Sequence, residues 1–145
     1  MKTVWEFIVK NKKVILIILT ILIFLFIGLP AIKKINGKRR LETFDKGVYG
    51  IALVTEYRAE TRSTHYRYEF EYKDEIYSSR YYYANYNPEV GKRYFVLIDP
   101  DHPWFNNMLL PIFPVPDSIK EAPPEGWKEC PGVSRKQIRE FLDHY

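Results

Sequence analysis

The first apolar stretch of the chain is uniform rather than periodic. Residues 14–29 read VILIILTILIFLFIGL without a charge, and the apolar run continues to Ile32. A helix over these nineteen residues would rise roughly 28 Å, close to the roughly 30 Å hydrocarbon core of a bilayer. A helix in water needs a polar face, and Thr20 is the only polar side chain here. We therefore predict a transmembrane helix over residues 14–32, preceded by a basic tail over residues 1–13.

Two further questions concern this segment. A secretory signal is cleaved after a small residue, and the residue two positions before that one is small as well. Cleavage after Gly28 or Ala31 would place Phe26 or Leu29 at that earlier position, so we expect an uncleaved anchor in a bacterial inner membrane.

The charges beside the segment bear on its orientation, because Lys and Arg favour the cytoplasmic side. Six of them follow the segment and four precede it, whereas the short N-terminal tail favours the opposite arrangement, so the orientation stays open.

From residue 47 onward the pattern changes to an alternation with a period of two. Residues 64–73 (THYRYEFEYK) alternate strictly, with His65 and the charged side chains on the face expected to meet solvent. The other face is aromatic and carries Tyr66, Tyr68, Phe70 and Tyr72. Similar β-branched and aromatic stretches occupy residues 48–57 and 76–83. We predict three antiparallel strands here.

The register of the second and third strands depends on the turn that joins them. If Asp74 and Glu75 form a two-residue turn, Glu69 lies opposite Arg80, and tyrosines lie opposite tyrosines on the other face. Each such pair contributes a few tenths to about 1 kcal/mol. This pairing is the register that we predict.

The rest of the chain predicts two more strands and a helix. Residues 94–98 (YFVLI) are apolar on both parities, which is typical of a central strand covered on both faces. Residues 108–113 predict an edge strand, and residues 114–133 a Pro-rich extended segment. Residues 134–145 predict an amphipathic helix with a capping box at Ser134 and Gln137. Its apolar stripe, which includes Ile138 and Phe141, is expected to cover the tyrosine-rich sheet face.

The predicted fold class is mainly β. One N-terminal transmembrane helix is followed by a basic linker (residues 33–46) and a small antiparallel β-meander, curled into a half-barrel, over residues 47–113. A C-terminal helix completes the fold.

The distribution of charge explains the basic character of the chain. Residues 1–46 carry ten basic and three acidic side chains, or +7, and residues 47–145 carry twelve and fifteen, or −3, which sum to the net +4. A mildly acidic β-domain argues against binding of nucleic acid. The basic linker residues Lys33, Lys34, Lys38, Arg39 and Arg40 predict a topology signal, with contact to anionic lipid headgroups as the sharper alternative.

The chain shows no pattern that predicts catalysis. His65, His102 and His144 are far apart in sequence, and no phosphate-binding glycine loop occurs. The single cysteine, Cys130, excludes an internal disulfide and has no neighbouring histidine that would activate it. Asp99 and Asp101 are explained by a proline-flanked turn. We predict no catalytic, cofactor or metal site, and a protein that is not an enzyme.

Tyrosine is the residue type with the most pronounced clustering. Nine of the twelve tyrosines lie between Tyr66 and Tyr94. They favour strands, so filling the fold is the simpler interpretation. Buried phenols need hydrogen-bond partners, so incomplete burial of this set would leave a binding platform, with Tyr82, Tyr86 and Trp104 as candidate contacts for a partner.

The hairpin YRYEFEYKDEIYSS, followed by VGKRYFVLIDPDHP, resembles uncharacterised bacterial membrane-anchored or secreted proteins with a small β-domain. In those proteins a hairpin of the form Y-x-Y-x-V-N-G-K-x-Y precedes a D-P-x-x-P turn. Here Lys73, Asp74 and Glu75 stand where they often have Asn-Gly-Lys. The resemblance covers roughly residues 47–128; it implies a β-domain, favours a protein that is not an enzyme, and gives no activity or substrate.

These observations lead to three hypotheses about function. The first is a single-pass membrane protein whose β-domain binds a protein partner or serves an envelope assembly. The second is an accessory or immunity subunit that acts on a membrane protein through its transmembrane helix. The third is a carbohydrate- or peptide-binding module that uses the tyrosine-rich face.

Overall fold

The structure is a computed structural model that describes residues 12–24, 26, 38, 41–60, 63–82 and 85–144. The chain divides into two compact units, residues 1–39 and 40–145. In the first unit, helix α2 spans Lys12–Ile23. Within the described part of the chain, no helix combines the length and the apolarity needed to cross a membrane. The predicted transmembrane segment falls only partly there, since residues 25 and 27–32 lie outside the described residues.

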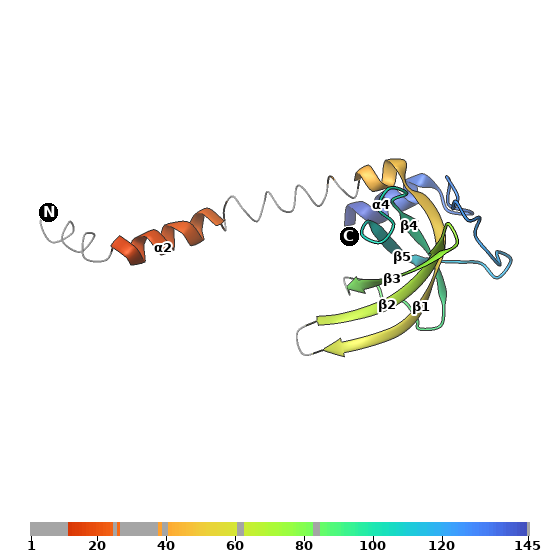
Figure 1. Cartoon of the computed structure of the whole chain (residues 1–145), viewed down its shortest axis with the longest axis horizontal. Coiled ribbons are helices and arrows are strands. Elements are labelled where there is room, and N and C mark those ends of the chain that lie inside the picture. Colours follow the sequence, from red (N-terminus) through yellow and green to blue (C-terminus); the bar gives the residue numbers. More distant parts are fainter. Residues whose placement is uncertain are drawn as a thin grey trace, which may run out of the picture. The chain divides into compact units, whose positions relative to one another are not determined.

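The second unit is a five-stranded antiparallel sheet with a C-terminal helix (Figure 1). The strands are β1 (Val48–Glu60), β2 (Ser63–Tyr72), β3 (Glu75–Tyr82), β4 (Arg93–Ile98) and β5 (Asn107–Pro114). Helix α4 spans Arg135–His144. All five predicted strands and the predicted C-terminal helix are present, within a few residues of the expected bounds.

The strand order, β3-β2-β1-β4-β5, differs from the predicted simple meander, in which β4 would lie beside β3. The reason is the length of β1. Residues 48–53 of β1 pair with β4, whereas residues 52–60 pair with β2. β1 thus lies at the centre of the sheet with a partner on each side, and β4 lies between β1 and β5 rather than at an edge. Residues of β3 and β5 contact each other, so the sheet curls toward closure, in agreement with the predicted half-barrel.

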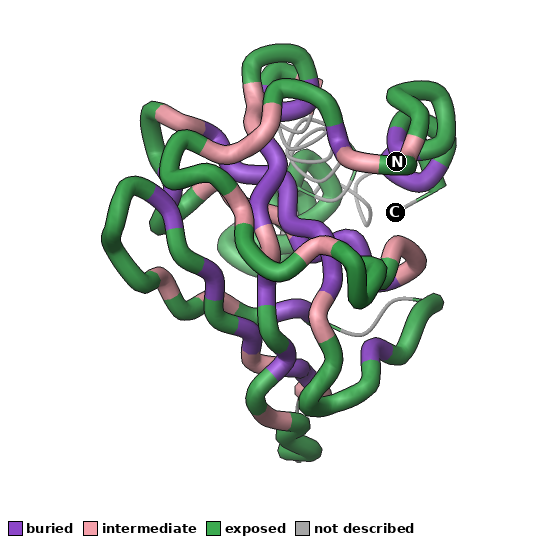
Figure 2. The backbone as a smooth tube through the Cα atoms, turned by 90° about the vertical axis from the view of Figure 1, so that its right-hand side faces the viewer, coloured by how far each residue is buried: buried purple, intermediate pink, exposed green. Residues whose placement is uncertain are grey.

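The sheet separates two hydrophobic clusters, and β4 contributes to both. Tyr94, Val96 and Ile98 face the inner cluster, whereas Phe95 and Leu97 face the outer one. Buried and more exposed positions alternate along β2 from Tyr66 to Tyr72, and short buried and exposed stretches follow one another along the backbone in Figure 2. The inner cluster holds the aromatic set of β2 (Tyr66, Tyr68, Phe70 and Tyr72). The prediction of a doubly covered central strand is therefore confirmed.

Helix α4 covers the outer cluster, so the expectation that it would cover the tyrosine-rich face was wrong. Ile138, Phe141 and Leu142 are buried there together with Phe95 and Leu97 of β4. The curl of the sheet fills the tyrosine-rich face with its own strands, whereas the opposite face of β1, β4 and β5 needs a cover. The predicted capping box is confirmed, because the Ser134 N–H donates to Gln137 Oε1 (2.9 Å) and the Gln137 N–H to Ser134 Oγ (3.3 Å).

The predicted register of β2 and β3 was wrong by two residues. Glu69 lies opposite Ser78, and Arg80 lies opposite Arg67. The turn residues are Lys73 and Asp74, which both adopt positive φ angles of 53° and 62°, as the tight primed hairpin turns require. A slip of two residues leaves every side chain on its predicted face and changes only the cross-strand partners.

The Pro-rich segment, residues 114–133, is fastened to the outer face by backbone hydrogen bonds. Tyr49 and Trp127 exchange two of them, at 2.7 and 2.8 Å, and the Lys73 N–H donates to the Pro124 carbonyl at 2.8 Å. Gly126, beside this bridge, has a φ of +69°, and a Cβ there would approach the Tyr49 carbonyl oxygen to 2.9 Å. Glycine is therefore required at this position both for its conformation and for space.

Candidate functional site

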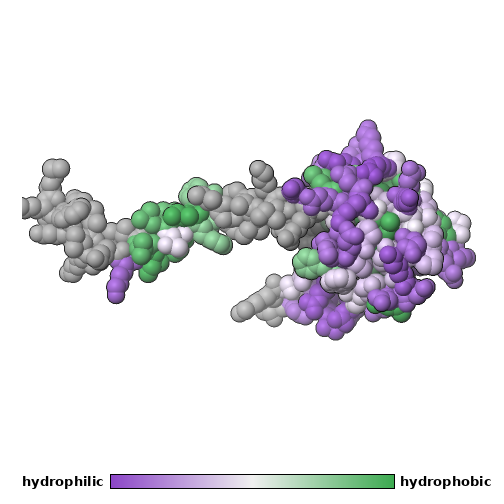
Figure 3. Space-filling model, turned by 45° about the horizontal axis from the view of Figure 1, so that its top comes forward, coloured by the Kyte–Doolittle hydropathy of each residue, from purple (hydrophilic) through white to green (hydrophobic). Residues whose placement is uncertain are grey.

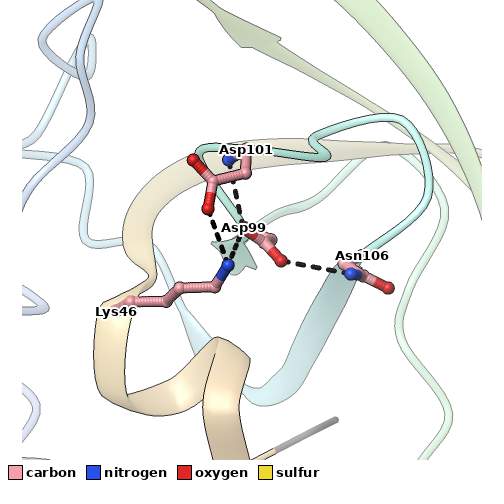
Figure 4. Close-up of polar contacts among 4 residues, drawn as sticks. All are labelled: Lys46, Asp99, Asp101 and Asn106. Carbon is pink, nitrogen blue, oxygen red and sulfur yellow. Dashed lines mark hydrogen bonds and ion pairs between the residues drawn. The ribbon is translucent and has the colours of Figure 1, made fainter.

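A polar network joins residues 41–46, which are helical, to the β4–β5 loop (residues 99–106) (Figure 4). Lys46 Nζ lies 3.1 Å from Asp99 Oδ1 and 2.7 Å from Asp101 Oδ2. The Asn106 side-chain amide donates to Asp99 Oδ2 at 3.1 Å. The Asp99 side chain is 3% exposed, whereas that of Asp101 is 66% exposed. Asp99 is thus a buried acceptor at the centre of the network.

The sequence of the β4–β5 loop explains its compact shape. The backbone N–H of Asp101 donates to Asp99 Oδ1 at 3.1 Å, which is the local turn that an Asp before proline favours. The Asp99 N–H donates to the Asn106 carbonyl at 2.8 Å and closes the base of the loop. Within it, the N–H groups of Phe105 and Asn106 both donate to the His102 carbonyl, at 3.1 and 2.8 Å. The backbone of this loop is therefore held at several points.

Opposing effects set the ionisation of Asp99. Burial alone would raise the pKa of its carboxyl group, but hydrogen bonds from Asn106, from the Asp101 N–H and from Lys46 favour the charged form. The net result is a pKa below the ordinary value. Hydrogen bonds to Asp101 and Asp99 raise the pKa of Lys46 in turn. Asp99 is therefore a charged group in a paired, structural role.

The network leaves two large aromatic side chains in solvent. Trp104 is 63% exposed and Phe105 is 69% exposed. The only ring contact of Trp104 among the described residues is an edge contact with His102, at 5.8 Å between centroids. Adjacent exposed aromatics on a well-fastened loop are unusual in a small domain, since aromatic side chains normally bury most of their surface.

Tyr82, Tyr86 and Trp104, the predicted partner contacts, lie in three different environments. Tyr82 is half-exposed at the end of β3, and its ring lies 5.7 Å from His65. Tyr86 lies 5.7 Å from Phe141. No ring contact joins any two of the three in the described part of the chain. Their role as contacts for a partner stays a prediction, now for separate surfaces.

Tyr86 belongs to an open groove of about 340 Å³ between β5 and α4. Its lining is mainly apolar and aromatic, with two titratable groups at the side: Ile112, Phe113 and Phe141, with Glu140 and His144. The groove has the chemistry of a shallow peptide- or ligand-binding surface.

Most of the tyrosine-rich face is buried, in agreement with the simpler interpretation that these tyrosines fill the fold. Tyr66, Tyr68, Tyr72 and Tyr81 lie in the inner cluster. Loops at the rim supply hydrogen bonds to several phenols. Tyr68 Oη donates to Asn107 Oδ1 at 2.6 Å, and Tyr66 Oη donates to Asn87 Oδ1 at 3.2 Å. This face therefore forms the core, which leaves Tyr82 and Tyr86 outside it.

His65 was predicted to lie on a solvated face, and the structure buries it to 4% exposure. It lies opposite Arg58 on β1 and Tyr82 on β3. The Tyr82 ring packs against the imidazole at 5.7 Å. Strict alternation predicted the correct face, but the long neighbouring side chains cover the smaller His65.

The corrected register places two cationic side chains, Arg67 and Arg80, directly opposite each other. Opposed like charges destabilise a sheet. We expect Arg80→Glu to raise the free energy of unfolding by about 0.5 kcal/mol, because it places an acid opposite Arg67. Arg80→Gln, which only removes the repulsion, should give a smaller gain. Urea unfolding at low ionic strength measures both. A decrease for Arg80→Glu would instead support the register in which residue 80 faces Glu69.

The described residues hold no group of three or more His, Cys, Asp or Glu side chains that could bind a metal ion. Cys130 is buried, and burial raises the pKa of its thiol to about 12. A neutral buried thiol is a poor nucleophile.

Of the predicted headgroup contacts, Lys33, Lys34, Arg39 and Arg40 lie outside the described residues, and Lys38 is exposed. Their contact with lipid stays a prediction.

Comparison of the chain with family models, with curated proteins and with solved structures finds no match to any of them. The resemblance to bacterial membrane-anchored β-domain proteins therefore stays a prediction from the sequence.

Proposed function

We propose that the chain is a non-enzymatic, single-pass membrane protein that presents a small β-domain to a protein partner or an envelope assembly. The observation that carries this proposal is the surface of α2. Its apolar side chains whose burial is described are 43–66% exposed, and Phe24 and Phe26 beyond its end are exposed as well. Figure 3 shows this apolar surface. Soluble proteins rarely expose a contiguous apolar surface of this kind.

Thr20, the single polar side chain in the part of α2 that follows Lys12 and Lys13, supports the same proposal. The Thr20 hydroxyl donates to the carbonyl oxygen of Leu16, one turn earlier, at 2.9 Å. This bond satisfies the hydroxyl within the helix, as a segment surrounded by lipid requires. Together with the uncharged run over residues 14–32, the surface of α2 fits an apolar solvent better than water.

Extraction of membranes at high pH tests the anchor. The full chain, expressed in a bacterial host, is expected to stay in the membrane pellet, because an inserted helix resists alkaline carbonate. Leu16→Glu combined with Leu19→Glu and Ile23→Glu should release the chain or prevent its accumulation, since each charge near the middle of a span costs about 2.5–3.5 kcal/mol.

A triple change of the same residues to Ala, Val and Leu serves as the matched control and should leave the chain in the pellet. Release of the unchanged chain by carbonate would contradict the proposal.

The same membranes settle the orientation. Cys130 is buried, so a thiol reagent should react with it only slowly in the native domain. Asp117, on the Pro-rich segment, is exposed. Asp117→Cys should react with an impermeant maleimide on intact spheroplasts if the β-domain lies outside, and only after lysis if it lies inside.

A further inference from the structure

We propose that the β4–β5 loop is a second membrane contact, which inserts Trp104 and Phe105 into the interface of the bilayer that holds the anchor. This inference rests on the proposed function and concerns the β-domain alone. The surface that the loop contacts is that of the lipid bilayer. Three observations support it: the exposure of the aromatic pair, the fixed shape of the loop, and the position of the loop beside the entry of the chain into the domain.

The aromatic pair has the chemistry of an interfacial anchor. Trp combines a large apolar ring with one N–H donor, and Trp residues are enriched where a bilayer meets water. Trp104 and Phe105 are consecutive and both are more than 60% exposed. Pro103, which precedes them, is buried and fixes the backbone there. Among the described residues, the one ring contact of this pair is that of Trp104 with His102.

The loop is rigid enough to hold the pair outward without help from a partner. Asn107 Nδ2 donates to the Pro103 carbonyl at 2.7 Å, and Tyr68 Oη donates to Asn107 Oδ1 at 2.6 Å. These bonds tie the backbone just before Trp104 to the inner core. A preorganised loop loses little conformational entropy when it inserts, so more of the gain from burying the rings is retained.

The position of the loop argues for a membrane rather than another protein. Lys46 lies at the end of the basic linker and pairs with Asp99 and Asp101 of the β4–β5 loop (Figure 4). The loop therefore lies at the point where the chain enters the β-domain. Fourteen residue steps lead from Ile32 to Lys46. They span about 21 Å as a helix and at most about 50 Å when extended. The length of the linker therefore limits the distance between Lys46 and the predicted anchor to about 50 Å at most.

Fluorine NMR of the full chain tests this inference. The chain is labelled with fluorotryptophan at Trp5, Trp104 and Trp127 and reconstituted in vesicles of phosphatidylcholine and phosphatidylglycerol. Trp104→Phe assigns the resonance of interest. A lipid with a spin label near its headgroup should broaden the Trp104 resonance several-fold more than that of Trp127, which packs against Phe95. Trp127 is thus an internal control from the same domain.

A water-soluble gadolinium chelate supplies the opposite readout. If the chelate broadens Trp104 strongly and the spin-labelled lipid leaves it unchanged, the loop faces water and the inference is overturned. Flotation of the same vesicles keeps the two proposals distinct. A chain that does not float with the vesicles contradicts the membrane anchor itself. A chain that floats, with Trp104 unaffected by the labelled lipid, contradicts the loop contact alone.

Discussion

Replacing Tyr68 by alanine is expected to lower the free energy of unfolding of the β-domain by about 3–5 kcal/mol. Tyr68 is 1% exposed in the inner cluster. Its ring stacks with Phe70 at 6.2 Å, and its hydroxyl reaches from β2 to Asn107 at the start of β5. The substitution removes the largest kind of core side chain and leaves a cavity that the curled sheet cannot close.

Tyr68→Phe separates packing from hydrogen bonding. It keeps the ring and should cost about 1–2 kcal/mol, because the Asn107 carbonyl loses its donor. Tyr82→Ala is the matched control from the next strand, since the half-exposed Tyr82 ring should cost less than about 1 kcal/mol. Urea unfolding of the full chain in detergent, followed by near-ultraviolet circular dichroism, measures all three. An equal cost for Tyr68→Ala and Tyr82→Ala would show that the inner cluster is not the main core.

The faces of the strands could be predicted from the sequence, whereas their partners could not. Alternation predicts which side of a strand is apolar, and Tyr66 and Tyr68 are buried accordingly. The β2–β3 register depended on whether the turn begins at Lys73 or Asp74. Two consecutive residues without glycine adopt positive φ there, and no hydrophobic pattern reports that choice.

The sequence also does not show which elements pack on each face of the sheet. Residues 94–98 are apolar on both parities, so both faces of β4 require a cover, and the pattern does not say which cover each receives. The curl of β1 decides it, because it brings β3 toward β5 and fills the inner face with tyrosines. Only the outer face remains for α4.

Single residues of the candidate site could be predicted from the sequence, but their contacts with one another could not. Trp104 was singled out for its aromatic ring, and the acidic pair Asp99 and Asp101 was explained by a turn. Lys46 was assigned to the linker. The ion pair between Lys46 and Asp101 joins residues 55 positions apart, and no periodicity relates such positions. The exposure of Phe105 beside Trp104 accompanies the closed shape of the loop, which is held by the hydrogen bonds of Asp99 and Asn107.

Replacing Asp99 by alanine is expected to lower the free energy of unfolding by about 2–4 kcal/mol at neutral pH. The half-buried Asn106 amide and the Asp101 N–H would both lose their acceptor, and a buried donor left unsatisfied costs about 1–3 kcal/mol. Asp101→Ala is the matched control. Its side chain is largely exposed, so the loss of its ion pair should cost less than about 1 kcal/mol.

The effect of Asp99 should also depend on pH in a defined direction. Its pKa in the folded protein is lower than in the unfolded chain, so the stability gained from its charge is fully present above about pH 4, near the unfolded value. That stability is lost as the pH falls through the folded value. The difference in unfolding free energy between the unchanged chain and Asp99→Asn should therefore shrink below about pH 4. A difference that stays constant from neutral to acidic pH would contradict a charged Asp99. Because Asp99 holds the β4–β5 loop closed, the same substitution should also reduce the broadening of Trp104 by spin-labelled lipid.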